Sequence, residues 1–123
     1  MRREFENPGS GDQYPTAIEN NLVHQIKNYI HGHLSEKLSI DEMAKALKTS
    51  RSMIFLTMKR ELDTTPLAYH AGRRIELAKE MLRTPDIPLT TIALDLGFSS
   101  SQHFSTVFKK LEGMAPSHYR DRE

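Results

Sequence analysis

The stretch GFSSSQHFSTVFKK, residues 97–110, combines a helix stop, a run of serines and a basic end. We expect a helix to begin near Ser100, because a serine hydroxyl just before a helix accepts a hydrogen bond from a free amide of the first turn. Apolar residues then recur at spacings of three and four and predict one apolar stripe: Phe104, Val107, Phe108 and Leu111. Small, polar and basic residues occupy the other face: Ser101, Gln102, Ser105, Thr106 and Lys109. That face fits a nucleic-acid groove, although many solvated helices share its composition.

The same order of features occurs twice in the chain, in residues 38–69 and again in residues 87–119. Apolar residues, a serine start, a basic pair, a proline and a tyrosine correspond in both copies. Matching pairs include Met43 with Ile92, Ala44 with Ala93, Ile54 with Phe104, Met58 with Phe108, and Lys59 with Lys109. Each copy predicts a helix, a tight turn and a second helix, which is the arrangement of a helix-turn-helix unit.

Helical signals also cover the rest of the chain. Thr16 followed by Glu19 has the capping-box pattern and predicts a helix that continues to about His33. Pro66 is well suited to a first helical turn and starts the longest predicted helix, which ends before Pro85. Further helices are expected from Ser39 to about residue 47 and at residues 51–61, 89–96, 100–112 and 116–121, with no hairpin signal.

These elements predict an all-α fold of seven helices, built as two helix-turn-helix subdomains joined by a linker helix. The expected organisation is a flexible tail (1–15), a first subdomain (16–64), the linker helix (65–84) and a second subdomain (85–123). A helix of nineteen residues, 66–84, spans about 28 Å, close to the roughly 34 Å between successive major-groove faces of DNA. We therefore expect two recognition helices in adjacent major grooves.

Composition bounds the function. A length of 123 residues suits one domain, and the lack of cysteine removes disulfides, thiolate nucleophiles and thiolate metal sites. No apolar run is long enough for a bilayer or a secretory signal, so we expect no membrane partner and a cytoplasmic location. The net charge of +1 argues weakly against a nucleic-acid binder. The case for DNA therefore depends on the paired cations: Lys59 with Arg60, Arg73 with Arg74, and Lys109 with Lys110.

Neither an enzyme nor a metal site is expected. The acidic residues that precede or follow the predicted helices are explained by capping and turn chemistry, and no nucleophile stands beside a base. His31 and His33 are two residues apart, so they do not share a helix face, and no other ligands complete a tetrahedral set. We expect no catalytic residues, no cofactor and no metal.

Residues 20–121 resemble the DNA-binding domain of the AraC/XylS family of bacterial transcription regulators. The resemblance is carried by the runs RRIELAKEMLRTPDIPLTTIA and IALDLGFSSSQHFSTVFKKLEGMAPSHYR. It implies a seven-helix, bipartite domain that binds an asymmetric promoter site in double-stranded DNA as a monomer and activates transcription by contacting RNA polymerase, in the bacterial cytoplasm at the nucleoid. A dimer is expected only where a separate domain supplies it.

The resemblance also implies which residues contact DNA. Those that face the bases are Arg51, Ser52, Phe55, Leu56, Ser101, Gln102, Ser105 and Thr106. Leu56 and Thr106 stand where the family commonly has arginine, so both usual bidentate guanine contacts, worth about 1–3 kcal/mol each, are missing. We hypothesise that Phe55 and Leu56 contact thymine methyl groups and that the first unit binds AT-rich sequence. Backbone phosphates are expected to contact Ser50, Lys59, Arg73, Arg74, Ser100, Lys109, Lys110, Ser117 and His118.

Three alternatives remain open from the sequence. Phe55 and Leu56 fit the core as well as a surface that faces DNA, because residues 53–58 are apolar on all sides, and a surface for a protein partner is a third option. The basic pairs also fit solvated helix ends, where cations interact favourably with the helix dipole. The rival function is a helical adaptor that keeps the fold and binds a protein partner with weak or no specific DNA binding.

Overall fold

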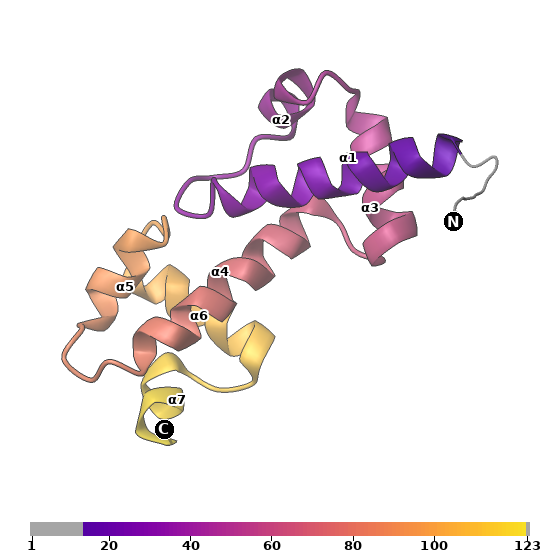
Figure 1. Ribbon diagram of the computed structural model, residues 1–123. Coiled ribbons are helices and arrows are strands. Elements are labelled where there is room, and N and C mark those ends of the chain that lie inside the picture. The colour runs from indigo at the N-terminus through magenta and orange to yellow at the C-terminus, as the bar shows by residue number, and fades with distance from the viewer. Residues whose placement is uncertain (1–13, 123) are drawn as a thin grey trace. The chain divides into compact units, whose positions relative to one another are not determined.

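Seven helices and no strand make up residues 14–122, the part of the chain that the computed structural model describes (Figure 1). The helices are α1 (Tyr14–His31), α2 (Ile40–Ala46), α3 (Arg51–Leu62), α4 (Pro66–Leu82), α5 (Leu89–Asp95), α6 (Ser101–Glu112) and α7 (Pro116–Arg122). The predicted all-α fold of seven helices is confirmed.

The largest error in the predicted boundaries is at α1. This helix begins at Tyr14 instead of Thr16, so Thr16 is not its cap. Pro15 causes no break there, because a proline in the first helical turn removes an amide that would have no intrahelical partner. The helix also ends at His31, before the predicted His33. Apart from Tyr14 and Pro15, the predicted tail, 1–15, lies outside the described residues.

Two compact units account for the described residues. The first unit contains α1 up to Tyr29 together with Ser39–Pro66, which includes α2 and α3. The second contains Ile30–Leu38 and the chain from Leu67 onward, which includes nearly all of α4 and all of α5, α6 and α7. The predicted subdomain boundaries, which gave the linker helix a segment of its own, stay a prediction.

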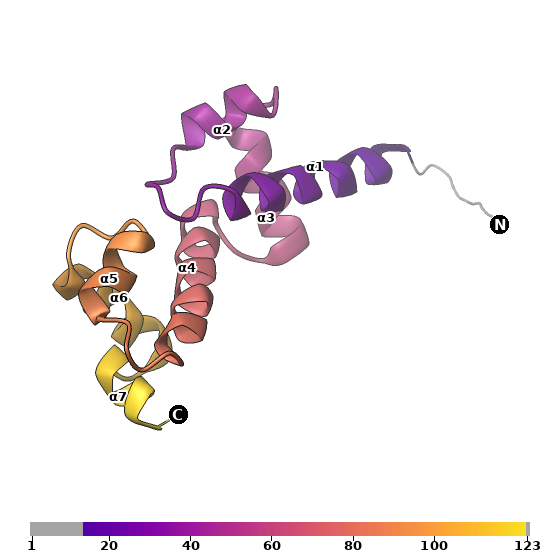
Figure 2. The ribbon, with the colours of Figure 1, turned by 60° about the vertical axis from the view of Figure 1, so that its left-hand side comes forward.

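In the first unit, α2 and α3 follow one another through a tight turn (Figure 2). Their inward residues are fully or almost fully buried: Met43, Ala44, Ile54, Thr57 and Met58. On α1, Val23 and Ile26 are buried as predicted by their spacing. The inner side of α3 therefore consists of Ile54, Thr57 and Met58, which have no exposed surface. The other side chains of this helix are exposed or half-buried.

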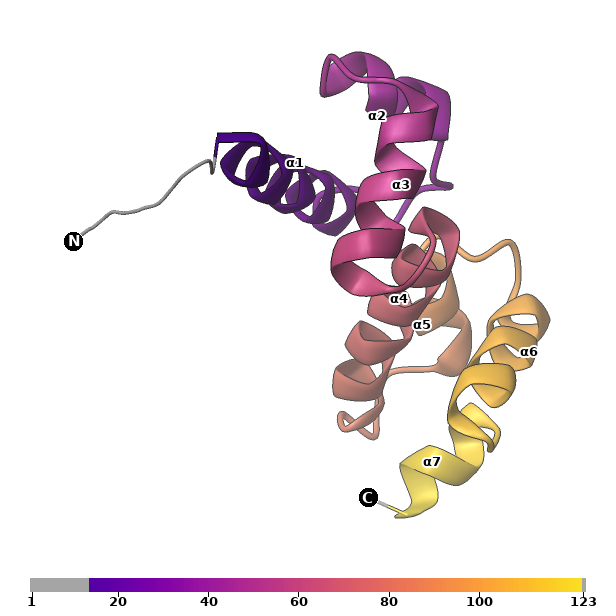
Figure 3. The ribbon, with the colours of Figure 1, turned by 90° about the vertical axis from the view of Figure 1, so that its right-hand side faces the viewer.

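In the second unit, α4, α5 and α6 enclose one apolar core, and α7 follows α6 after a short connection (Figure 3). The core residues are Ile75, Ala78, Leu82, Ile92, Ala93, Leu96, Phe98, Phe104 and Phe108. Phe104 and Phe108 have no exposed surface, and their rings meet edge to face with centroids 5.8 Å apart. Burying these two side chains fixes the rotation of α6 and hence its outward face.

The predicted apolar stripe of α6 is wrong at Leu111, which is 48% exposed. Phe104 and Phe108 are four residues apart, and the next residue at that spacing is Glu112. Glu112 is half-buried and lies 3.3 Å from the Lys79 ammonium group of α4. The inward position in the last turn of α6 therefore belongs to an ion pair, and Leu111 is turned outward.

The two copies of the repeat have similar turns, although the turn of the second copy is one residue longer. Ser50 and Ser100 are both N-caps, and their hydroxyls accept hydrogen bonds from the amides of Met53 (3.1 Å) and His103 (3.0 Å). Before each cap, one residue has a left-handed conformation: Lys48 with φ of 57° and Gly97 with φ of 83°. After each recognition helix, Asp63 (φ 53°) and Gly113 (φ 84°) are left-handed as well.

A difference between the copies predicts a stabilising substitution. Thr57 is fully buried, and its hydroxyl has no hydrogen-bond partner among the described residues, whereas the second copy has Val107 at this position. An unpaired buried hydroxyl costs roughly 1–3 kcal/mol, so Thr57→Val is expected to raise the free energy of unfolding by about 1 kcal/mol. Urea unfolding followed by circular dichroism measures this, with Val107→Thr as the opposite change. A loss of stability in Thr57→Val contradicts the prediction.

The left-handed turn of the first unit gives a second prediction. A side chain in this conformation costs roughly 1–2 kcal/mol, and Lys48 is exposed. We expect Lys48→Gly to raise the free energy of unfolding, because glycine adopts this conformation without strain. Glycine also increases the entropy of the unfolded chain, which opposes the effect. The net increase in the free energy of unfolding should therefore be about 1 kcal/mol or less. Lys48→Ala is the control, because alanine keeps the Cβ and should give no such gain. Equal stability of the two variants would exclude backbone strain at this position.

Candidate nucleic-acid interface

The outward side of α3 carries the residues that were predicted to face DNA bases. Arg51, Ser52, Phe55 and Leu56 are all exposed, with Phe55 38% and Leu56 52% accessible. The alternative in which Phe55 and Leu56 are buried in the core is therefore wrong. Met53 is also 37% exposed, so three large apolar side chains reach the surface of one helix.

Arg51 is the only arginine among the predicted base-facing residues of α3, and it is held by an ion pair. Its guanidinium donates to the Asp41 carboxylate of α2 at 2.6 Å. Both side chains are mostly exposed, so the pair contributes little to stability, but it directs the guanidinium toward α2.

The outward side of α6 is polar and smaller. Gln102 and Thr106 are exposed, whereas Ser101 and Ser105 are half-buried. The Thr106 hydroxyl donates to the backbone carbonyl of Gln102 at 3.0 Å, one turn earlier in the same helix. Gln102 therefore carries the side-chain amide with which this helix could form two hydrogen bonds to a base edge.

Exposed cations lie in the last turns of α3 and α6 and on α4. Lys59, Arg73, Lys109 and Lys110 are exposed, as are Ser117 and His118 at the start of α7. The Lys59 ammonium group lies 2.7 Å from the carboxylate of Asp63, one turn later. Lys109 and Lys110 form no ion pair with any described residue.

Arg74 does not fit its predicted role as a phosphate ligand. The side chain is only 8% exposed, because its guanidinium donates to the backbone carbonyls of Leu34 and Glu36, each at 2.6 Å. The guanidinium carbon also lies 5.0 Å from the centre of the Phe98 ring. Burial lowers the pKa of Arg74, although a guanidinium stays protonated at neutral pH. Arg74 therefore anchors the segment after α1, and the prediction is wrong because these carbonyls occupy its donors.

Three more residues hold the segment after α1 within the second unit. His70 is 5% exposed, and its Nε2 lies 3.1 Å from the His33 carbonyl oxygen. The His31 Nε2 lies 2.8 Å from the Tyr69 hydroxyl, and the two rings stack. Gly97 has no room for a side chain, because a Cβ would collide with the backbone carbonyl of Ser35.

Arg120 has a similar structural role at the other end of α4. Its guanidinium donates to the carbonyls of Leu82 and Thr84, both at 3.1 Å. Sequence reasoning assigned no role to this residue, since a basic residue in a short final helix gives no signal of a long-range partner. The contact closes the C-terminal end of α4 against α7.

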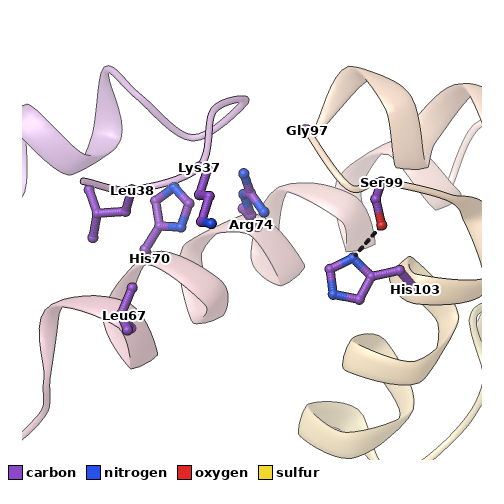
Figure 4. Close-up of a pocket in the computed structure, with 8 residues that line it drawn as sticks. All are labelled: Lys37, Leu38, Leu67, His70, Arg74, Gly97, Ser99 and His103. Atoms are coloured by element: carbon purple, nitrogen blue, oxygen red, sulfur yellow. Dashed lines mark hydrogen bonds between the residues drawn. The ribbon is translucent and has the colours of Figure 1, made fainter. Parts of the chain in front are cut away.

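A cleft of about 370 Å³ lies beside the start of α6 (Figure 4). Lys37, His70 and Arg74 lie on one side, and Ser99 and His103 on the other. The Ser99 hydroxyl lies 3.2 Å from Nδ1 of His103, and the imidazole also meets the Phe98 ring edge to face. No acidic residue lines the cleft, so its charge is positive or neutral.

The comparisons with known proteins agree with this arrangement. The family described as "Helix-turn-helix domain" matches residues 43–122. A solved transcriptional regulator of Chromobacterium violaceum, of the AraC-type DNA-binding domain-containing proteins, has a TM-score of 0.78 and 25% identity, covering 86% of this chain and 95% of that one. The regulatory protein SoxS of Salmonella typhimurium is 34% identical over 101 residues, which are 82% of this chain and 94% of SoxS. The chain belongs to the AraC/XylS family.

As an AraC/XylS protein, this chain contains the DNA-binding domain of a transcription regulator, and its relatives are not enzymes. The probable transcriptional regulator LumQ of Photobacterium leiognathi is 35% identical over 95 residues. These residues are 77% of this chain but only 38% of LumQ. The predicted resemblance to the family is confirmed.

Two further features are absent from the described residues. None of the helices within residues 14–122 combines the length and apolar character that crossing a bilayer requires. Within the same part of the chain, no group of three or more histidines and carboxylates is arranged to hold a metal ion.

The buried His70 predicts a dependence of stability on pH. Burial lowers the pKa of His70 from its usual 6.5; the hydrogen bond to the His33 carbonyl acts against this, and the Arg74 charge adds to it. Below pH 6.5 the unfolded chain therefore binds more protons at this residue than the folded chain, so stability falls as the pH decreases.

We expect the free energy of unfolding to be level above about pH 7 and to fall between pH 6.5 and the lower folded pKa. Urea unfolding of the wild type and of His70→Gln across this range measures the effect, because glutamine does not titrate. The difference between the two proteins should shrink with decreasing pH. A constant difference would show that His70 does not contribute.

Proposed function

We propose that this chain binds double-stranded DNA sequence-specifically, with α3 and α6 as recognition helices in adjacent major grooves, and thereby regulates transcription. The observation that carries the proposal is a helix with an exposed outward face, directly after a serine-capped tight turn, in both copies of the repeat. In helix-turn-helix proteins this second helix lies in the major groove, and its N-terminal residues contact base edges.

The length of α4 supports contact with two grooves by one chain. Its 17 residues span about 25 Å, and grooves on one side of the duplex recur about every 34 Å, so a modest bend of the DNA would suffice. Two copies of the unit in one polypeptide would then bind a site for which other helix-turn-helix proteins dimerise. We propose a monomer for this chain on that ground.

Each recognition helix has a proposed set of base contacts: Arg51, Ser52, Phe55 and Leu56 from α3, and Ser101, Gln102, Ser105 and Thr106 from α6. The proposed phosphate contacts are Ser50, Lys59, Arg73, Ser100, Lys109, Lys110, Ser117 and His118. Arg74 is removed from this set because its donors are occupied by carbonyls.

We add Lys37 to the proposed phosphate contacts. It is exposed, forms no ion pair with a described residue, and lines the cleft beside the first turn of α6 together with His103. A cleft without carboxylates next to the groove-entering end of a recognition helix suits a backbone phosphate.

The downstream role is proposed from the family. We propose that the bound protein contacts RNA polymerase and activates transcription, acting at the bacterial nucleoid in the cytoplasm. Transcription in vitro from a promoter that carries the selected binding site tests this role. Activation by purified protein would support it, and repression or no effect would contradict it.

A protein-binding adaptor is the second candidate function. It is favoured by the exposed Met53, Phe55 and Leu56 on α3 and by the net charge of only +1. Selection of bound sites from random duplexes at low salt separates the two functions. A DNA-binding regulator should retain sites with two conserved segments about 10 base pairs apart, whereas an adaptor should retain no duplex.

The phosphate contacts predict the salt dependence of DNA binding. Lys109→Ala and Lys37→Ala are each expected to weaken binding to all sequences alike and to reduce the slope of log affinity against log salt by about one. Lys27→Ala is the matched control, since it removes the same charge from α1, outside the proposed contacts. Fluorescence anisotropy with a labelled duplex over a series of salt concentrations measures the slopes. A slope unchanged by Lys109→Ala and equal to that of the control would contradict the proposed contact.

A further inference from the structure

We infer that α3 recognises thymine methyl groups through Phe55 and Leu56, so that specificity under the first unit comes from apolar contact instead of hydrogen bonds. The inference rests on the proposed function and concerns the bases that this helix selects. Its basis is the combination of two exposed apolar side chains with the ion pair that holds the guanidinium of Arg51 against Asp41.

Phe55 and Leu56 do not belong to the core of the first unit. The buried side of α3 is already filled by Ile54, Thr57 and Met58, each with no exposed surface. Phe55 and Leu56 lie outside this buried side and are 38% and 52% exposed. Large apolar side chains that are exposed on one helix can mark a binding surface.

Among the proposed base contacts of α3, only Arg51 has a side chain that suits guanine. Bidentate recognition of guanine needs the forked donors of arginine or the ammonium of lysine at the base edge. The guanidinium of Arg51 is directed to Asp41, 2.6 Å away, and Ser52 has only a short hydroxyl.

The surroundings of the patch favour DNA over an apolar protein surface. Arg51 precedes Phe55 by one helical turn and Lys59 follows it by one turn, so cations lie on both sides of the apolar residues, each in an exposed ion pair with Asp41 or Asp63. DNA matches this order of cation, apolar residues and cation, because its major groove has apolar groups on the bases and a row of phosphates on each side. The thymine methyl is the apolar group that the major groove presents, and phenylalanine is among the side chains that contact it.

Phe55 and Leu56 should contact methyl groups on different base pairs. Consecutive residues of an α-helix point about 100° apart, so the two side chains diverge across the groove. The expected sequence under α3 therefore contains at least two A·T pairs.

Replacement of thymine by deoxyuridine tests the inference, because it removes only the methyl group. The full chain is titrated, by fluorescence anisotropy, against a selected duplex and against duplexes in which each thymine in turn is deoxyuridine. One lost methyl contact corresponds to about 0.8 kcal/mol, so affinity should fall about fourfold at each contacted position. Phe55→Ala and Leu56→Ala should each bind thymine and deoxyuridine equally at one such position.

Leu111→Ala is the control for these variants. It removes an exposed leucine from α6, outside the proposed base contacts, and should keep the full sensitivity to deoxyuridine. Thermal unfolding confirms that the three variants are folded, as expected for substitutions at exposed side chains. Leu56→Arg supplies a forked donor at the same position and should shift the selected base there toward guanine.

The outcomes separate this inference from the proposed function. Wild-type protein that binds selected duplexes but is insensitive to every deoxyuridine overturns the inference and leaves DNA binding intact. Sensitivity that persists in both Phe55→Ala and Leu56→Ala also overturns it. If no duplex is retained at low salt, the proposed function fails and the inference fails with it.

Discussion

Each helix-turn-helix unit depends on one left-handed residue in its turn. Lys48 and Gly97 reverse the chain directly after α2 and α5, and the following serines then start α3 and α6. Equivalent backbone hydrogen bonds close the two turns, from Thr49 to Ala44 and from Phe98 to Ala93, each at 2.9 Å. This local geometry brings the two helices of each unit together, and the burial of apolar side chains then decides which side of α3 and α6 faces outward.

The two units have left-handed residues at corresponding places but differ in which residue types occupy them. The first has Lys48 and Asp63 where the second has the glycines that a left-handed conformation favours. It also buries a hydroxyl at Thr57 where the second has valine. The second unit therefore has glycine at both of its left-handed positions. Its core contains three buried phenylalanines, Phe98, Phe104 and Phe108. The first differs from it both in its turn and in the chemistry of its outward face.

The helices were predictable because their signals are local. A serine cap, a proline in a first turn and apolar spacing act within a few residues, so α2 to α7 were predicted to within about two residues, as is usual where caps are clear. The orientation of α6 followed from Phe104 and Phe108, but the outward turn of Leu111 did not, since it depends on the ion pair between Glu112 and Lys79.

The candidate site was less predictable than the fold. The sequence left Phe55 and Leu56 equally suited to the core and to the surface, because only the packing of Ile54, Thr57 and Met58 decides which side of an apolar helix is covered. Arg74 was misassigned because its carbonyl partners, Leu34 and Glu36, lie about forty residues away in the chain. Lys37 gave no signal for the same reason. Contacts between distant segments leave no periodic pattern in the sequence.

The ion pair between Lys59 and Asp63 means that this lysine carries an internal counter-ion. When a free lysine meets a phosphate, a mobile cation leaves the DNA, and the gain in mixing entropy is largest in dilute electrolyte. In the proposed complex with DNA, Lys59 would first give up its carboxylate neighbour, 2.7 Å away, whereas Lys109 and Lys110 have no such competitor among the described residues. We therefore expect rising ionic strength to loosen the second unit before the first, so that dissociation proceeds in two stages.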